Sequence, residues 1–189
     1  LMKKKLFAFF FLLSTLPTTS FSDAESFCNN KLNQEVVENI DNLKIKTIEV
    51  NIDNYRKWAQ NSLEILIGNF RWIPQKYKTR FNANIVVNFE NNLTCSFKAR
   101  VRHSGDQKDH ISLKGNSIIQ SVDVHLETGN IYGITKFKLL RSITRGNFED
   151  EIFLTELLRE LNYLAPRTSY VDVKINQVES KMIFQEKAA

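Results

Sequence analysis

The carboxyl-terminal half of the chain consists of short runs that alternate apolar and polar residues, interrupted once by a helix-like run. Alternation with a period of two indicates β-strands that bury one face. The strand-like runs are residues 93–103, 117–126, 131–140, 168–176 and 180–186. The helix-like run, residues 147–164, begins with acidic residues and ends before Pro166. This order predicts an α+β fold, in which one long helix is inserted into an antiparallel sheet.

The predicted helix has a broad apolar face. Its members are Ile152, Phe153, Leu157, Leu161 and Leu164. A face of this width predicts packing against the sheet.

The segment before residue 93 predicts a strand, a helix and the first strand of a hairpin. Residues 43–52 alternate as a strand, and Asp53 is the predicted cap of a helix through residues 54–70. Residues 80–89 and 93–103 flank a short turn, which predicts a hairpin. Trp58 and Trp72 are predicted to be core or packing residues and not a platform for a ligand. We therefore divide the mature chain into an amino-terminal extension, residues 23–92, and a second part, residues 93–189.

The amino terminus has the pattern of a secretory signal peptide, residues 1–22. Three lysines, Lys3 to Lys5, precede an apolar run from Leu6 to Leu16, and small residues follow. The run is short for a membrane span. It predicts an exported protein, periplasmic, extracellular or attached to the cell envelope, with no membrane attachment after signal cleavage.

The composition is that of a globular chain. Of its 189 residues, 42% are hydrophobic and 25% are charged, with only 6 Gly and 3 Pro. The net charge of +5 permits binding to anions, but Lys3 to Lys5 are removed with the signal peptide. This balance does not predict a nucleic-acid partner.

The chain has two cysteines, Cys28 and Cys95. In an exported protein they are candidates for one structural disulfide. The alternative is two unpaired thiols. Their spacing does not suggest a zinc site.

The connection after residue 103 is rich in ionisable residues and contains two glycines. A loop of this kind can bring backbone N–H groups and fixed cations to phosphate oxygens. A solvated hairpin loop is the alternative interpretation. The predicted order of strands and helix is that of the small lobe of protein kinases, in which such a connection covers the nucleotide phosphates.

Several motifs together resemble the amino-terminal half of the CotH kinase family, named for spore coat protein H of spore-forming bacteria. They are GDQKDHI, SVDVHL, GNIYGITKFKLL, TRGNFEDEIFLTELLRELNYLAPRTSYVDVKIN and MIFQEK, within residues 95–189. The resemblance implies a kinase-like small lobe, with the amino-terminal strand and helix as an extension. It also implies that the catalytic aspartates lie in a large lobe beyond Ala189, so that the chain is truncated.

The resemblance implies that ATP and a divalent cation such as Mg2+ bind, and that phosphate is transferred to a protein substrate. Lys138 is the predicted phosphate-contacting lysine because it lies late in the strand before the helix, and Lys136 is the second choice. Glu151 or Glu156 in the helix is the predicted partner of that lysine, with Glu151 preferred. Glu186 would belong to the hinge, whose backbone meets the adenine edge.

Five further residues are predicted to lie around the phosphates. Gly105, Asp106 and His110 belong to the connection after residue 103, which would cover the phosphates as a flap. Arg145 and Arg102 would reach phosphate from the two sides of this flap. Asp106 and His110 are suitable beside phosphate only if a divalent cation intervenes or if they serve as hydrogen-bond braces. Arg145 has an alternative role beside the acidic residues that follow it.

Two other functions compete with the kinase-like one. The first is a non-catalytic, exported binding module for the cell envelope or for acidic partners. The second is a metal-dependent hydrolase whose ligands would be His103, Asp106, Asp109 and His110.

Overall fold

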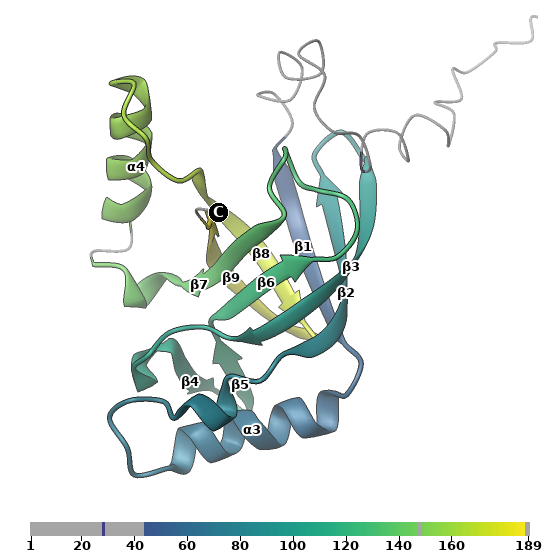
Figure 1. The fold of residues 1–189 in the computed structure, drawn as a ribbon, viewed down its shortest axis with the longest axis vertical. Helices are drawn as coiled ribbons and strands as arrows, with labels where there is room; N and C mark the ends of the chain where they lie inside the picture. Colours follow the sequence, from purple (N-terminus) through teal and green to yellow (C-terminus); the bar gives the residue numbers. More distant parts are fainter. Residues whose placement is uncertain (1–27, 29–43, 147–148, 188–189) are drawn as a thin grey trace, which may run out of the picture.

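The computed structural model describes residue 28, residues 44–146 and residues 149–187. Its main feature is a closed barrel with the strand order β1-β2-β3-β6-β7-β9-β8 (Figure 1). These strands are β1 (Ile45–Ile52), β2 (Phe81–Phe89), β3 (Thr94–His103), β6 (Val122–Leu126), β7 (Lys136–Arg141), β8 (Thr168–Ile175) and β9 (Val178–Glu186). The predicted signal peptide lies outside the described residues.

The barrel closes through a parallel pairing between β1 and β8. Thr47 to Val50 lie beside Asp172 to Ile175. The other neighbouring strands pair antiparallel. Because the circle is complete, each barrel strand has a partner on both sides and the sheet has no open edge.

The predicted fold, a kinase-like small lobe with a long inserted helix, is wrong. The structure is mainly β, and the strand expected in an amino-terminal extension is part of the same barrel as β8. The physical reason is the β1–β8 pairing, which joins segments more than a hundred residues apart. Alternation within one segment gives no information about which distant segment it pairs with.

The alternating residues fill the barrel interior. On β3, Phe97, Ala99 and Val101 are buried, while Arg100 and Arg102 between them point outward. The interior also contains Phe137 on β7 and residues from each of the other strands. The pattern of the sequence therefore fixes which side chains reach the outer surface.

Helix α3 (Tyr55–Ile67) lies beneath the barrel, with the hairpin of β4 (Ile111–Lys114) and β5 (Ser117–Gln120) beside it (Figure 1). Asn54, and not Asp53, caps the helix by accepting a hydrogen bond from the Lys57 N–H. Trp58 is buried, as predicted. Trp72 is 56% exposed, so it does not belong to the core.

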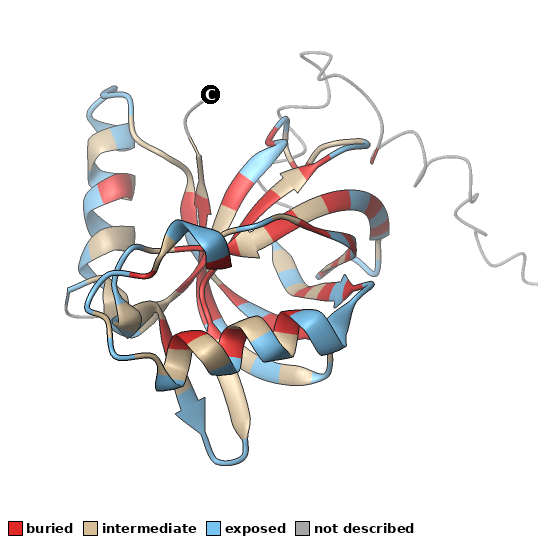
Figure 2. Cartoon of the chain, turned by 60° about the horizontal axis from the view of Figure 1, so that its bottom comes forward, coloured by how far each residue is buried: buried red, intermediate tan, exposed pale blue. Residues whose placement is uncertain are grey.

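Helix α4 (Asp150–Glu160) is shorter than predicted and stands at the side of the barrel. Asn162, just after the helix, has a φ of 61° in the left-handed region, and the Tyr163 N–H donates a hydrogen bond to the Leu158 carbonyl, which terminates the helix. The apolar face predicted to pack is largely exposed, and only Thr155 of the helix is buried (Figure 2). Among the described residues, no helix is long and apolar enough to cross a membrane.

Cys28 and Cys95 form a disulfide, which decides the question that their spacing left open. It joins the segment before β1 to β3, across a sequence separation of 67 residues. Cys95 lies in the barrel interior with Phe97 as its neighbour along the strand. The bond therefore anchors a point before the first strand to the barrel core.

We predict that reduction of this disulfide lowers the free energy of unfolding by about 2–4 kcal/mol, because the reduced unfolded chain gains conformational freedom. Urea denaturation with and without a phosphine reductant measures the change. A Cys28→Ala/Cys95→Ala variant should unfold at the same urea concentration in both conditions. A reductant effect of similar size in that variant would contradict the prediction.

Candidate functional site

A polar cleft of about 340 Å3 lies on the outer side of the barrel, between β7 and the first part of the connection that follows β3. It is lined by Trp72, Ser104, Gly105, Asp106, Gln107, Asp109, His110, Lys138, Leu140 and Arg145. Five of the predicted site residues are among them: Gly105, Asp106, His110, Lys138 and Arg145. They come from three separate segments of the chain.

The connection after β3 is held in place by main-chain hydrogen bonds. The Ser104 N–H donates to the Ser121 carbonyl, and the Ser121 N–H donates to the His110 carbonyl. Only residues 104–110 line the cleft, because the next residues form the β4–β5 hairpin on α3. The connection predicted to be one flap is thus divided into a short segment at the cleft, residues 104–110, and the separate β4–β5 hairpin.

Gly105 permits the close approach of this segment to His110. Its φ is 95°, and a Cβ atom there would lie 2.0 Å from the His110 ring. A side chain at this position would therefore displace the imidazole as well as strain the backbone. The ring is held from its other side, since His110 Nδ1 lies 3.0 Å from the Ser121 hydroxyl.

Lys138 and Arg145 supply positive charge to the cleft. Lys138 is an outward residue of β7, and Arg145 follows the short turn Ser142–Thr144. Neither side chain makes an ion pair or a hydrogen bond with another described residue, and the Arg145 Nε atom is buried without a partner. The cleft therefore contains two cations that form no ion pair with a described carboxylate, although Asp106 and Asp109 line the same cleft.

Burial lowers the pKa of His110, and the charges of Arg145, Lys138 and Arg141 lower it further, while Asp109 acts in the opposite direction. The imidazole is therefore neutral at pH 7 and has a nitrogen that donates a hydrogen bond. A neutral donor beside two cations suits an anionic ligand.

The two carboxylates of the cleft differ in their surroundings. Asp106 forms an ion pair with Lys78, whose hydrogen bond and charge lower the pKa of Asp106 below its ordinary value. For Asp109 the contact is with the backbone and not with the carboxylate, since its backbone carbonyl accepts a hydrogen bond from the Arg141 guanidinium. Lys78 thus offsets one of the negative charges in the cleft.

The other predicted site residues lie outside the cleft. Lys136 is exposed two residues before Lys138 on β7. Arg102 lies 3.6 Å from Asp123, which is across the β3–β6 pair. The cleft therefore does not include the second-choice lysine or the arginine expected on the far side of the loop.

The two glutamates have other partners. Glu151 accepts a hydrogen bond from Gln185, the residue beside Lys138 in the β7–β9 register, so the predicted Glu151–Lys138 pair is replaced by a contact through its neighbour. Glu186 binds Arg167 through both carboxylate oxygens, at 3.0 and 3.2 Å. The hydrogen bond from Arg167 lowers the pKa of Glu186, although burial opposes it.

The structure does not bring the four residues of the hydrolase hypothesis together. His103 is an inward residue whose ring stacks on Trp58 with the centroids 4.1 Å apart. In the part of the chain that the structure describes, no three His, Cys, Asp or Glu side chains are placed to hold a metal ion together.

A second cavity of about 420 Å3 lies between α4 and the barrel. Its arginines are Arg159 and Arg167, and both already form ion pairs, with Glu156 and Glu186 respectively. Of the predicted site residues only Glu156, the alternative to Glu151, lines it, and Glu156 is paired with Arg159. We therefore place the candidate site in the cleft beside Lys138.

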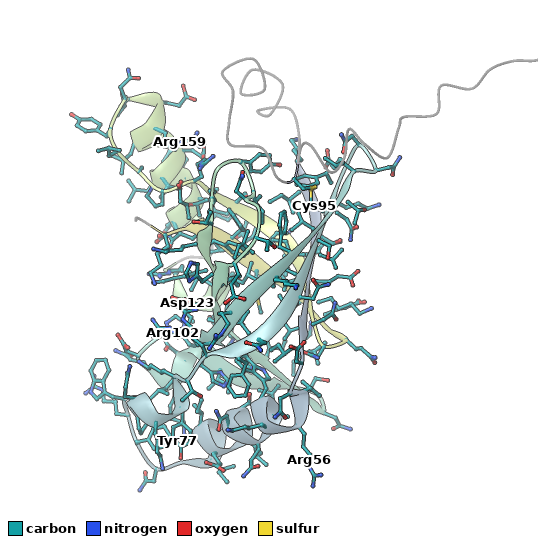
Figure 3. The ribbon with its side chains drawn as sticks, turned by 45° about the vertical axis from the view of Figure 1, so that its right-hand side comes forward. Arg56, Tyr77, Cys95, Arg102, Asp123 and Arg159 are labelled. Atoms are coloured by element: carbon teal, nitrogen blue, oxygen red, sulfur yellow. A yellow bond between two sulfur atoms is a disulfide. The ribbon has the colours of Figure 1, made fainter. Side chains whose placement is uncertain are left out.

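Asp123 is an important residue that the sequence interpretation missed. Its side chain is 3% exposed and lies between cations from three segments: Arg80 at 2.7 Å, Lys187 at 2.9 Å and Arg102 at 3.6 Å (Figure 3). Burial alone would raise the pKa of Asp123, but its hydrogen bonds with Lys187 and Arg80 and the charge of Arg102 lower it. The sequence feature that could have pointed to Asp123 is its position as the single acidic residue in the strand-like run SVDVHL.

Comparison with known proteins assigns no family to the chain. No protein-family model matches it. No curated protein matches it in sequence either.

We predict that His103 makes stability depend on pH. Burial lowers its pKa from 6.5 to about 4, with only partial opposition from a hydrogen bond to Gln120. The unfolded chain therefore takes up a proton near pH 6.5 while the folded chain does not, so stability is full above pH 6.5 and falls as the pH falls toward 4. Urea unfolding should show a loss of about 1–2 kcal/mol from this group between pH 7.5 and 5.0.

The His103→Phe variant keeps an aromatic ring against Trp58 and should lose this part of the pH dependence. His125→Gln, on the outer side of β6, is the matched control and should retain it. An unchanged pH dependence in His103→Phe would show that another group is responsible.

Proposed function

We propose that the cleft beside Lys138 binds the phosphate groups of a nucleotide. We also propose that the chain binds this nucleotide for phosphoryl transfer to a protein substrate, as in a CotH-like kinase. The observation that most supports this is the convergence of Lys138 and Arg145, neither paired with a described carboxylate, on a glycine-containing segment. The assignment of ATP and of the CotH family rests on the sequence resemblance.

The chemistry of the lining suits phosphate. An ammonium group and a guanidinium group form charge-assisted hydrogen bonds with phosphate oxygens, and the guanidinium can bind two oxygens at once. In the proposal, Lys138 acts as a point charge and Arg145 as the bidentate donor. Neutral His110 adds a hydrogen bond without adding charge repulsion to either cation.

A nucleotide-bound Mg2+ ion is compatible with this lining. Magnesium in nucleotide sites is held mainly by phosphate oxygens and water, with one or two carboxylates from the protein. Asp106 and Asp109 line the same cleft as Lys138 and are the carboxylates available for that role. The proposal gives the described residues the task of binding and orienting the nucleotide, and assigns none of them as the catalytic base.

We also propose that the protein is exported. The basic and apolar amino terminus supports this, and so does the Cys28–Cys95 disulfide, because disulfides persist in oxidising compartments. Phosphoryl transfer would then occur outside the cytosol.

A second candidate function is a non-catalytic, exported binding module for cell-envelope or acidic partners. The observation that favours it is a group of cations on the outer side of β3 and β7, away from the cleft. It does not need a nucleotide.

We predict that Lys138→Ala weakens nucleotide binding to the full chain at least tenfold, which corresponds to about 1.4 kcal/mol. Calorimetric titration with ATP in the presence of Mg2+ measures the dissociation constant. Lys136→Ala is the matched control, because it removes the same charge from the same face of β7 outside the cleft, and it should change the constant less than twofold. Equal losses in the two variants, or no saturable binding by the wild type, would refute the proposal.

A further inference from the structure

A second surface, distinct from the cleft, has more cationic than anionic side chains. It covers the outer side of β3, β6 and β7, together with Arg80 just before β2 and Lys187 just after β9. Its cations are Arg80, Lys98, Arg100, Arg102, Lys136 and Lys187. Its carboxylates are Asp123 and Glu127, which lie 2.7 Å from Arg80 and 4.0 Å from Arg100 respectively. We call these eight residues the basic face.

The strand register places four of these residues in two rows. Arg100 lies beside His125, which in turn lies beside Lys136, so this row crosses three strands. Arg102 and Asp123 begin the next row, which continues to Lys138 at the cleft. Since neighbouring strands lie about 5 Å apart, the cations are spread over the outer wall of the barrel and are not a single point of charge.

Asp123 holds one end of this array in place. Its buried carboxylate binds Arg80, Arg102 and Lys187, which come from three different segments. Their side chains are about one-third exposed, at 30%, 32% and 35%. A guanidinium has five N–H donors, so these arginines keep donors for a ligand after binding Asp123.

The basic face is not covered by any described element. Helix α3 lies below the barrel and α4 lies to its side (Figure 1). Arg102 and Asp123 lie close together in Figure 3, and the Arg102 side chain is 32% exposed whereas that of Asp123 is 3% exposed. Lys98 and Lys136 are exposed, and neither makes an ion pair with a described residue.

The residue types on this surface exclude several kinds of partner. The outward positions of β3, β6 and β7 up to Lys138 carry no aromatic residue except His125 and no aliphatic one. Binding of single-stranded nucleic acid relies on aromatic stacking, and protein interfaces rely on apolar anchors. Insertion into a lipid surface also needs apolar side chains.

We propose that the basic face binds a linear anionic polysaccharide, a chain whose sulfate, phosphate or carboxylate groups repeat at regular intervals. Repeating charges match rows of cations across several strands, whereas a single small anion would use only one or two of them. The hydroxyl groups of the sugars between the charges can accept hydrogen bonds from Lys and Arg side chains. This inference is independent of nucleotide binding, which is tested through Lys138.

The test uses heparin as the probe and the full chain as the protein. The Lys98→Ala/Lys136→Ala variant should bind fluorescently labelled heparin at least tenfold more weakly than the wild type. Lys46→Ala/Lys174→Ala, on β1 and β8, removes the same number of lysine charges elsewhere on the barrel and should change the affinity less than twofold. A thermal unfolding midpoint equal to that of the wild type shows that each variant is folded.

Two results would overturn the proposal. If both double variants lose affinity equally, overall charge and not the basic face governs binding. If a thymidine oligonucleotide or vesicles of anionic lipid bind the wild type as tightly as heparin does, the assignment to a polysaccharide is wrong. Saturable heparin binding that only the Lys98→Ala/Lys136→Ala variant loses, and that neither competitor matches, would support it.

Discussion

The parallel pairing of β1 with β8 is the constraint on which the rest of the structure depends. It brings Thr47 to Val50 beside Asp172 to Ile175 and turns an open sheet into a closed barrel. A closed barrel has a single inside, which apolar residues from all of its strands fill. Alternate residues are then forced outward, and on β3, β6 and β7 these are mostly charged.

The cleft and the basic face are two results of this arrangement. Lys138 and Lys136 share the outer side of β7, but only Lys138 lies beside the segment that packs against the end of β3. The hydrogen bonds from Ser104 N–H to the Ser121 carbonyl and from Ser121 N–H to the His110 carbonyl fix that segment. Two residues of spacing along one strand therefore separate a cleft lysine from a surface lysine.

The sequence predicted individual elements better than their assembly. Alternation located most strands, although the predicted strand 117–126 divides at Ser121, where the backbone bonds to His110. Gly105, Asp106 and His110 share the cleft because they are close in the sequence, whereas Lys138 and Arg145 are brought to it by the β3–β6 and β6–β7 pairings. Barrel closure, the Gln185–Glu151 contact and the cluster around Asp123 depend on pairings between distant segments, which periodicity does not reveal.

The Cys28–Cys95 disulfide has a consequence for a chain that meets proteases. The covalent ring that it closes contains β1, α3 and β2. A single cut within α3, or in the turn between α3 and β2, would leave two pieces that remain covalently joined at the barrel core. Cleaved and intact molecules should then have the same mass apart from one added water, and only reduction would release the fragments.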